Sequence, residues 1–185
     1  MTTDHSAPDR AAKRVVPQTI GILFVCSGNI CRSPTAEGVL RARLQAAGLD
    51  GRIGVDSAGT QGLHTKEPPD PRAQAHARRR GYDLSSQRAR RVIGDDFMRF
   101  HRILAMDDDH LEWLRDAAPP DATARIERLM THARRHRDQT EVPDPYYGAP
   151  ADFERVLDLV EDACDGLVEV LAADLIQIEA GGAKA

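Results

Sequence analysis

The stretch FVCSGNICRSPTAE at residues 24–37 limits the possible folds of this chain more than any other segment. It begins inside an apolar run with β-branched residues, TIGILFVC at 19–26, which is typical of a strand buried on both faces of a parallel sheet. Ser33 is a candidate helix N-cap, and Pro34 suits the first position of the helix that follows. The stretch therefore predicts a strand, a short loop and a helix in direct succession.

Strand-like and helix-like segments alternate along the rest of the chain. Apolar and β-branched runs predict strands at 52–58, 102–106 and 124–130. Apolar residues at helical spacing predict helices at 34–47 and 151–177. A glycine stop at Gly81 indicates a helix at 72–81, and acidic residues in the first turn indicate one at 107–116. We expect an α/β fold, a three-layer sandwich around a central four-stranded parallel sheet, with ligands at the carboxyl ends of the strands.

Length and composition fit one ordinary globular domain. The chain has 185 residues, 41% of them hydrophobic and 29% charged, and its net charge of −4 argues against a general nucleic-acid binder. No span has signal-peptide or transmembrane character, and three cysteines do not make a disulfide framework, so we expect a cytoplasmic protein. We divide the chain into a disordered extension at 1–18, a domain at 19–178 and a flexible tail at 179–185.

The loop after Cys26 has the composition of a phosphate-binding loop. Its backbone N–H groups and the start of the next helix form a cup for a tetrahedral oxyanion, and Gly28 and Asn29 tolerate the positive φ that a closed loop needs. The planar guanidinium of Arg32 can bind two phosphate oxygens at once. The same positive field favours the thiolate of Cys26, a nucleophile whose later departure the Ser33 hydroxyl would ease.

The other cysteines and histidines have simpler interpretations. A cysteine that ends a buried strand is usually a core residue, but the ordered Gly, Asn, Arg and Ser-Pro after Cys26 favour catalysis. No Gly-Lys-Ser/Thr follows as in nucleotide-binding loops, and the spacing from Cys26 to Cys31 does not suit zinc. We expect Cys164 in the core, and His132 and His136 at the solvated surface.

The segment VCSGNICRSPTAE resembles the signature of the low-molecular-weight protein tyrosine phosphatases. The resemblance covers residues 19–177 and continues through DSAGT at 56–60, PPDPRA at 68–73, ILAMD at 103–107 and VPDPYYG at 142–148. It implies a flavodoxin-like fold of the phosphotyrosine phosphatase I type. It also implies hydrolysis of phosphotyrosine monoesters through a cysteinyl-phosphate intermediate, with no metal and no organic cofactor.

The resemblance assigns roles to residues of the loop and of the VPDPYYG segment. Cys26 would be the nucleophile, Arg32 and the loop amides would bind phosphate, and Asp144 would be the general acid and base. Without the resemblance, Asp144 between two prolines indicates only a turn. Substrate contacts are further expected from Ser27, Gly28, Asn29, Ile30, Cys31, Ser33, Leu63, Tyr146 and Tyr147.

Several of these positions have a second interpretation. The resemblance implies that Ser57 supports Asn29 and that Asp107 is a further supporting residue, although a strand-end serine or a helix-capping aspartate would look the same. It also implies a reversible disulfide between Cys26 and Cys31, which would protect the nucleophile from irreversible oxidation. The two tyrosines could instead serve loop packing or be phosphorylated.

Two positions depart from the pattern of the family. Leu63 stands where many relatives have an aromatic wall of the pocket, and Gln87 stands where a histidine is frequent. Arsenate reduction on the same fold needs further cysteines, and none lies between Cys31 and Cys164. Protein-arginine phosphatases tend to have threonine at the place of Ile30. A catalytically inactive phosphopeptide-binding module is the third alternative, and the presence of nucleophile, arginine and acid argues against it.

Partners follow from the same resemblance. We expect a phosphotyrosine-containing protein substrate, with a tyrosine kinase as a candidate partner, and neither nucleic acid nor a membrane span. We expect a monomer or a weak dimer. The arginine clusters at 77–80, 88–91 and 133–137 are expected on exposed faces, where they would attract acidic phosphopeptides if they flank the pocket.

Overall fold

The computed structural model describes residues 20–182. The predicted extension at 1–18 lies outside the described residues, and so do residues 183–185 of the predicted tail. Within the described part, no helix combines the length and the apolar character needed to cross a bilayer.

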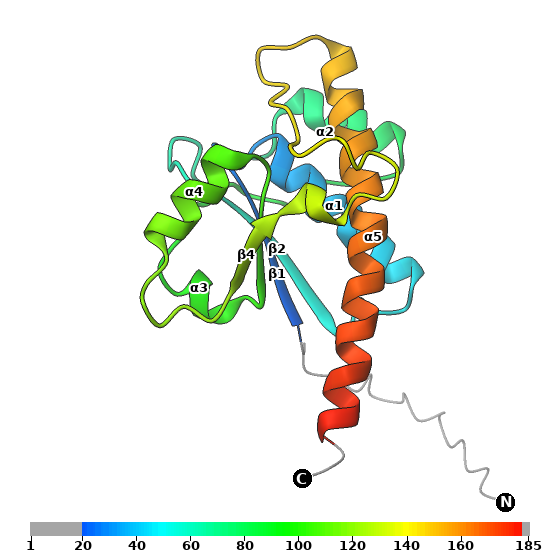
Figure 1. Cartoon of the computed structure of the whole chain (residues 1–185). Helices are drawn as coiled ribbons and strands as arrows, with labels where there is room; N and C mark the ends of the chain where they lie inside the picture. The colour runs from blue at the N-terminus through cyan, green and yellow to red at the C-terminus, as the bar shows by residue number, and fades with distance from the viewer. Residues whose placement is uncertain (1–19, 183–185) are drawn as a thin grey trace, which may run out of the picture.

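A four-stranded parallel sheet forms the centre of the molecule (Figure 1). Its strands are β1 (Ile20–Cys26), β2 (Ile53–Gly59), β3 (Arg102–Ala105) and β4 (Arg125–Arg128), in the order β2-β1-β3-β4. The chain moves from β1 to β2 on one side and returns to β3 on the other, so the strand order reverses at β1. A crevice for ligands opens beyond the carboxyl end of such a strand, and the sheet confirms the predicted fold class.

Helices cover both faces of the sheet and complete the predicted three-layer sandwich (Figure 1). On one face, α1 (Arg32–Ala46) packs along the long α5 (Pro150–Gly182), which also contacts α2 (Pro71–Arg79). On the other face, α4 (Asp108–Ala117) packs on β3 and β4 and lies near the four-residue α3 (Asp96–Arg99). The helix α3 was not predicted, because four residues are too few to show a helical period.

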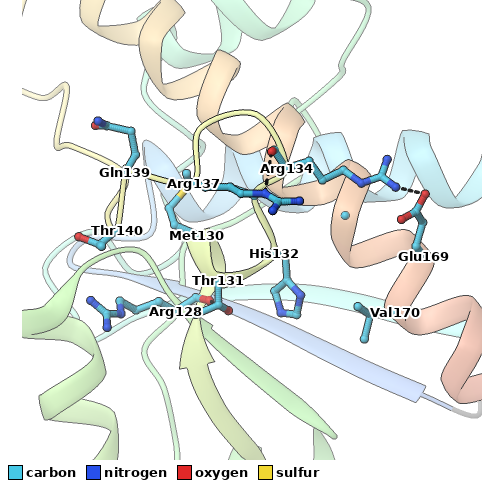
Figure 2. A pocket seen from close by; sticks show the side chains of 12 residues that line it. Arg128, Met130, Thr131, His132, Arg134, Arg137, Gln139, Thr140, Glu169 and Val170 are labelled. Atoms are coloured by element: carbon cyan, nitrogen blue, oxygen red, sulfur yellow. Dashed lines mark hydrogen bonds and ion pairs between the residues drawn. The ribbon is translucent and has the colours of Figure 1, made fainter.

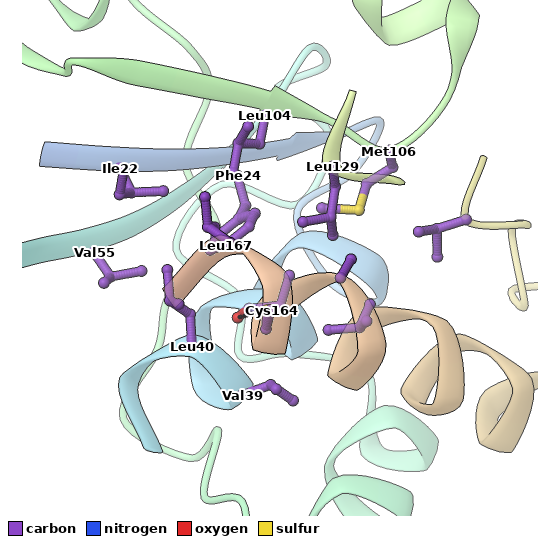
Figure 3. Packing of buried hydrophobic residues seen from close by; sticks show 14 of the residues in the cluster. Ile22, Phe24, Val39, Leu40, Val55, Leu104, Met106, Leu129, Cys164 and Leu167 are labelled. Carbon is purple, nitrogen blue, oxygen red and sulfur yellow. Dashed lines mark hydrogen bonds between the residues drawn. The ribbon is translucent and has the colours of Figure 1, made fainter. Parts of the chain in front are cut away.

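The alternation of side chains along β1 divides the core into two halves. Ile22 and Phe24 face α1 and α5, whereas Leu23 and Val25 face α3 and α4. Both halves are fully buried, which is why the strand reads as an unbroken apolar run. Figure 3 shows the first half, where Cys164 of α5 packs among these residues as a core side chain, as predicted.

Most boundaries differ from the prediction by one or two residues, and two of the differences have a cause in the packing. The strand expected at 124–130 ends at Arg128, because the buried Leu129 and Met130 turn into a short 3₁₀ helix, η1 (Leu129–His132), toward α5. The last helix continues to Gly182 rather than ending near 177, so residues 179–182 of the predicted tail are helical. Buried Leu175 extends its apolar face, and an ion pair of 2.7 Å joins Arg52 to Glu179.

Candidate active site

The loop between β1 and α1 lies at the point where the strand order reverses. Of the two residues expected to tolerate a positive φ, Asn29 has one, of +56°, and Gly28 does not. The loop is held against the end of β2, since Thr60 N donates to Cys26 O (2.9 Å) and Gln61 N donates to Ser27 O (3.0 Å). Gly59 permits this approach: a Cβ there would lie 2.5 Å from the Ser27 carbonyl oxygen.

The backbone amides of this loop are available to a ligand. In the described part of the chain, no carbonyl or side chain accepts a hydrogen bond from the N–H groups of residues 27–31. The first N–H groups of α1, which follow directly, are also unpaired by the nature of a helix start. A group of unpaired donors at a helix N-terminus favours a tetrahedral anion such as phosphate.

Ser33 is bonded to the cysteine rather than capping the helix. Cys26 Sγ lies 3.0 Å from Ser33 Oγ, which also accepts from Asn29 Nδ2 (2.9 Å) and lies 3.3 Å from the carbonyl oxygen of Ala58. The predicted N-cap role is therefore wrong: α1 begins at Arg32, with Cys31 at the cap position, so Pro34 is the third helical residue and not the first. The hydroxyl of Ser33 has one proton, which can point to the sulfur of Cys26 or to the carbonyl oxygen of Ala58. The first orientation stabilises a thiolate at Cys26, and the second leaves the hydroxyl oxygen free to accept from a thiol.

Asn29 is fixed on three sides. Its amide nitrogen donates to Ser33 and to Ser57 (2.9 Å each), and its amide oxygen accepts from the backbone N–H of Arg90 (2.9 Å). These bonds use the whole amide group and hold the residue in its left-handed conformation. Ser57 thus contacts Asn29 at the place the family resemblance implied.

Glu37 ends this network, and no sequence motif marked it. Ser57 Oγ donates to Glu37 Oε2 (2.7 Å), and Arg41 forms an ion pair with the same carboxyl group (2.9 Å). Burial raises the pKa of Glu37, although its bonds to Ser57 and Arg41 oppose the rise. Gln87 lies at the same helix, where its amide donates to the carbonyl oxygen of Pro34 (3.1 Å).

Arg32 is a buried cation held by two acids. Its side chain is 5% exposed; one terminal nitrogen binds Asp107 Oδ2 (2.7 Å) and Val142 O (3.2 Å), and the other binds Asp144 Oδ2 (2.9 Å). The structure therefore brings Asp144, 112 residues away, to the same guanidinium that follows the loop. These bonds fix the plane of the guanidinium, and Arg32 also lines the cavity around Cys26.

Asp107 is a half-buried anion. Burial opposes its ionisation, but hydrogen bonds from His110 and the charge of Arg32 outweigh that cost and lower its pKa to about 2. It caps α4, since His110 N donates to Asp107 Oδ1 (2.9 Å). The capping role and the contact with Arg32 thus coexist in one side chain.

The remaining predicted residues surround one cavity of about 340 Å³. Tyr146 and Tyr147 meet edge to face, with ring centroids 4.8 Å apart, and Leu63 is 79% exposed at the rim. Gln61 and His64 also line the cavity, and sequence reasoning missed both. The full lining comprises Cys26, Ser27, Gly28, Ile30, Cys31, Arg32, Gln61, Leu63, His64, Asp144, Tyr146 and Tyr147.

Cys31 lies in this lining but differs from Cys26. Burial, with nearby Asp70 adding to it, raises the pKa of the Cys31 thiol well above its ordinary value. All three cysteines are free and buried. Cys31 therefore carries a protonated thiol beside the loop, and the predicted disulfide with Cys26 stays a prediction.

A larger cavity, of about 610 Å³, lies beyond the carboxyl end of β4 and is lined by arginines (Figure 2). Two of its arginines are already paired with acids: Arg134 with Glu169, and Arg128 with Asp108 at 2.9 Å. Arg137 donates to the carbonyl oxygen of Arg134 (3.0 Å). This cavity contains no cysteine, so its size does not make it the better candidate.

The arginine clusters and the two histidines are engaged elsewhere. Arg80 pairs with Glu154 (2.6 Å), and Arg90 pairs with Asp56 and Asp96 (2.9 Å each). No residue of the clusters lines the cavity around Cys26. His132 lies against Glu127 (3.2 Å) with its side chain only 9% exposed, so its expected surface position is wrong, whereas His136 is 40% exposed. In residues 20–182, no group of three potential ligands could hold a metal ion.

Comparison with known proteins gives one consistent result. Residues 21–177 match the family model of low molecular weight phosphotyrosine protein phosphatases. A low molecular weight protein-tyrosine-phosphatase of Streptomyces coelicolor is 43% identical over 167 residues, which are 87% of this chain and 97% of that protein. One of Bacillus subtilis is 40% identical over 149 residues, 80% of this chain and 94% of that protein.

The structures agree with the sequences. The crystal structure of a protein tyrosine phosphatase from Entamoeba histolytica, with Hepes in its active site, superposes with a TM-score of 0.81 at 38% identity. The match covers 84% of this chain and 99% of that one.

Proposed function

The chain belongs to the low molecular weight phosphotyrosine protein phosphatase family and is a protein tyrosine phosphatase, and from that premise we propose a role for each residue of its site. The observation that carries the proposal is the position of Cys26. Its sulfur lies at the end of the central strand and lines a cavity with Arg32 and Asp144, below a loop whose amides have no acceptor within residues 20–182. Cys26 is the nucleophile of the reaction.

The first half of the reaction transfers the phosphoryl group to sulfur. The Cys26 thiolate attacks phosphorus, the bond from phosphorus to the tyrosyl oxygen breaks, and Asp144 gives its proton to that oxygen. Arg32 and the loop amides bind the three remaining phosphate oxygens as charge redistributes over them. The products of this half are a free tyrosine side chain and a phosphocysteine.

The second half regenerates the enzyme. The Asp144 carboxylate accepts a proton from water, the water oxygen attacks phosphorus, and the phosphorus–sulfur bond breaks. Inorganic phosphate leaves, and the thiolate of Cys26 is stabilised by the Ser33 hydroxyl at 3.0 Å. The acid and the nucleophile return to their starting protonation states.

The walls of the cavity support a phosphotyrosyl substrate. The paired rings of Tyr146 and Tyr147 and the apolar side chain of Leu63 form a slot for an aromatic ring. We propose a phosphotyrosine-containing protein as the substrate, with a tyrosine kinase as a candidate. Ser57 supports the loop through Asn29 in this proposal, and Asp107 supports Arg32.

The setting of the enzyme is a further proposal. Three free cysteines fit a reducing compartment, which supports a cytoplasmic location. We propose a catalytic domain spanning 19–178, and a monomer or weak dimer.

The test compares wild type with Cys26→Ser on p-nitrophenyl phosphate, a phosphotyrosine peptide and a phosphoarginine peptide. Serine is nearly isosteric with cysteine, but its hydroxyl is not ionised at neutral pH, so we expect turnover to disappear while phosphate binding persists. Phosphotyrosine should be the preferred peptide. Turnover that survives Cys26→Ser would overturn the nucleophile, and peptide binding without wild-type turnover would indicate a binding module.

A further inference from the structure

His110 is a buried histidine in direct contact with the phosphate-binding loop, and no sequence motif marked it. It lies in the first turn of α4 and is 4% exposed. Its Nε2 lies 2.8 Å from Ser27 Oγ, across 83 residues of sequence, and its Nδ1 lies 2.5 Å from Asp107 Oδ1. One imidazole therefore connects the residue after the nucleophile to the carboxylate that binds Arg32.

The first turn of α4 fixes the position of this imidazole. Asp107 caps the helix, because its carboxylate accepts a hydrogen bond from His110 N (2.9 Å). The backbone N–H of Asp108, the first residue of the helix, donates to Glu141 Oε1 (2.9 Å). The backbone of His110 is thus tied to the same carboxylate that its ring contacts. A ring anchored in this way can hold a partner hydroxyl in a defined direction.

The charges around His110 determine where its protons lie. Asp107 is ionised, because its pKa is about 2. Nδ1 lies 2.5 Å from the Asp107 carboxylate, and a bare lone pair at that distance would be repelled. Nδ1 therefore carries a proton, although its N–H does not point at the carboxylate oxygen well enough to form a hydrogen bond. The ring is then neutral, and its Nε2 accepts a hydrogen bond from the Ser27 hydroxyl.

We infer that His110 is a positioning residue for the phosphate site: it orients Arg32 through Asp107 and directs the Ser27 hydroxyl toward the bound phosphoryl group. The inference rests on the proposed function of the loop. Ser27 lines the cavity, so its hydroxyl can reach a ligand there. When the ring takes a second proton from solvent, Nε2 donates to Ser27 Oγ, and the hydroxyl hydrogen turns to a phosphate oxygen.

The neighbouring charges favour this change when phosphate binds. Asp107 of α4 and the incoming dianion stabilise the imidazolium, whereas Arg32 of α1, which contacts Asp107 from the other side, opposes it. Cys26, next to Ser27, adds a negative charge as thiolate, and Asp144 lies beyond Arg32. Phosphate binding should therefore be coupled to proton uptake by His110.

The experiment measures competitive inhibition by inorganic phosphate, with kcat and KM for p-nitrophenyl phosphate. The variants are Ser27→Ala, His110→Ala and the double variant, and each is studied from pH 5.5 to 7.5. His132→Ala is the matched control, because His132 is a similarly buried histidine against a carboxylate that lies outside the cavity. Ser27→Ala leaves α4 intact and keeps the test valid if His110→Ala does not fold.

We expect phosphate affinity to fall roughly tenfold in Ser27→Ala, the size of one hydrogen bond to a charged group, and further in His110→Ala, which also loosens Arg32 through Asp107. The double variant should lose no more than His110→Ala alone. KM should rise more than kcat falls. We expect wild type to bind phosphate more tightly at low pH, and both variants should lose this strengthening. Additive losses, an unchanged affinity in Ser27→Ala, or an equal loss in His132→Ala would overturn the inference. A wild type without Cys26-dependent turnover would instead overturn the proposed function.

Discussion

Asp107 and Asp144 both contact the guanidinium of Arg32, but they belong to regions of the molecule that are built differently. Asp107 caps a helix, its side chain is 19% exposed, and it receives the backbone N–H of His110 as well as Arg32. Asp144 lies in a loop between two prolines, and its side chain is 49% exposed. Besides Arg32, its only hydrogen-bond donor in the described structure is the backbone N–H of Tyr146 (3.1 Å).

The two acids therefore have different roles: Asp107 is a fixed negative charge beside Arg32, and Asp144 can transfer a proton. A carboxylate with a pKa of about 2, such as Asp107, stays ionised throughout the physiological range and serves as a fixed anion. Asp144 lies at the mouth of the cavity, where water and a substrate oxygen can reach it. The same cation thus binds one acid that stabilises its position and one that can exchange protons with the substrate.

Of the variants that test this contrast, Asp144→Asn should have the largest effect, because it keeps the size of the side chain and removes its acidic proton. We expect kcat for a phosphotyrosine peptide to fall roughly 10²- to 10³-fold, as when a general acid is lost. The fall for p-nitrophenyl phosphate should be much smaller, because p-nitrophenolate leaves readily without a proton. Steady-state kinetics with both substrates makes the comparison, and an equal fall for both would contradict the role of acid.

Asp107→Asn should instead weaken phosphate binding and stability, with little dependence on the leaving group. The pKa of about 2 for Asp107, against an ordinary 3.8, corresponds to about 2 kcal/mol of folding stability at neutral pH. A carboxyl group with a lowered pKa stabilises the fold above its unfolded pKa, so this contribution should vanish as pH falls from about 4 to about 2.

Urea unfolding at pH 7 and at pH 3 measures this contribution. The gap in unfolding free energy between wild type and Asp107→Asn should be wide at pH 7 and narrower at pH 3. A gap that is the same at both values would show that the charge of Asp107 does not stabilise the fold.

The contrast between the two acids also explains which parts of the site the sequence could predict. The strand, the loop and the helix around Cys26 are contiguous, so local patterns were enough to place the phosphate cup. Asp144 is 112 residues from Arg32, and only the resemblance to a family joined the two. His110 and Glu37 reach the loop through contacts with Ser27 and Ser57, which no local pattern encodes.

The errors of prediction have the same origin. Ser33 has the residue type of a helix cap, but the sulfur of Cys26 and the amide of Asn29 engage its hydroxyl. Gly28 can adopt a positive φ, yet Asn29 alone supplies the left-handed turn of the loop. His64 lies close to Gly28, where a Cβ would be 3.1 Å from its ring. Tertiary contacts therefore overrode local preference at the site itself.

A smaller effect tests what holds the segment before the Asp144 loop. Asp162 of α5 is 1% exposed and accepts the backbone N–H groups of Arg134 (3.3 Å), Arg135 (3.0 Å) and His136 (2.8 Å). Burial opposes its ionisation, but these bonds lower its pKa far below the ordinary range. Asp162→Asn would turn an amide N–H₂ toward these donors, and we expect a loss of about 1–3 kcal/mol in unfolding free energy.

The kinetics of Asp162→Asn show whether the segment at 134–136 influences the loop that contains Asp144. We expect kcat and KM at 25 °C to stay near the wild-type values, because Asp162 lines no part of the cavity. Urea unfolding and steady-state assays on the same preparation give both readings. A large fall in kcat at unchanged stability would mean that the hydrogen bonds of Asp162 also determine the position of Asp144.

The smallest effect concerns the rim of the cavity, where Leu63 stands in place of an aromatic wall. Leu63→Trp should add a stacking surface opposite the tyrosine pair, and it costs little because the position is 79% exposed. We expect KM for a phosphotyrosine peptide to fall about two- to tenfold, the usual strength of an aromatic pair, while inhibition by inorganic phosphate stays unchanged. Ile93→Trp, at an exposed position outside the cavity, is the matched control. If both variants lower KM equally, or if phosphate inhibition shifts with KM, Leu63 does not form a wall for the substrate ring, and the slot consists of Tyr146 and Tyr147 alone.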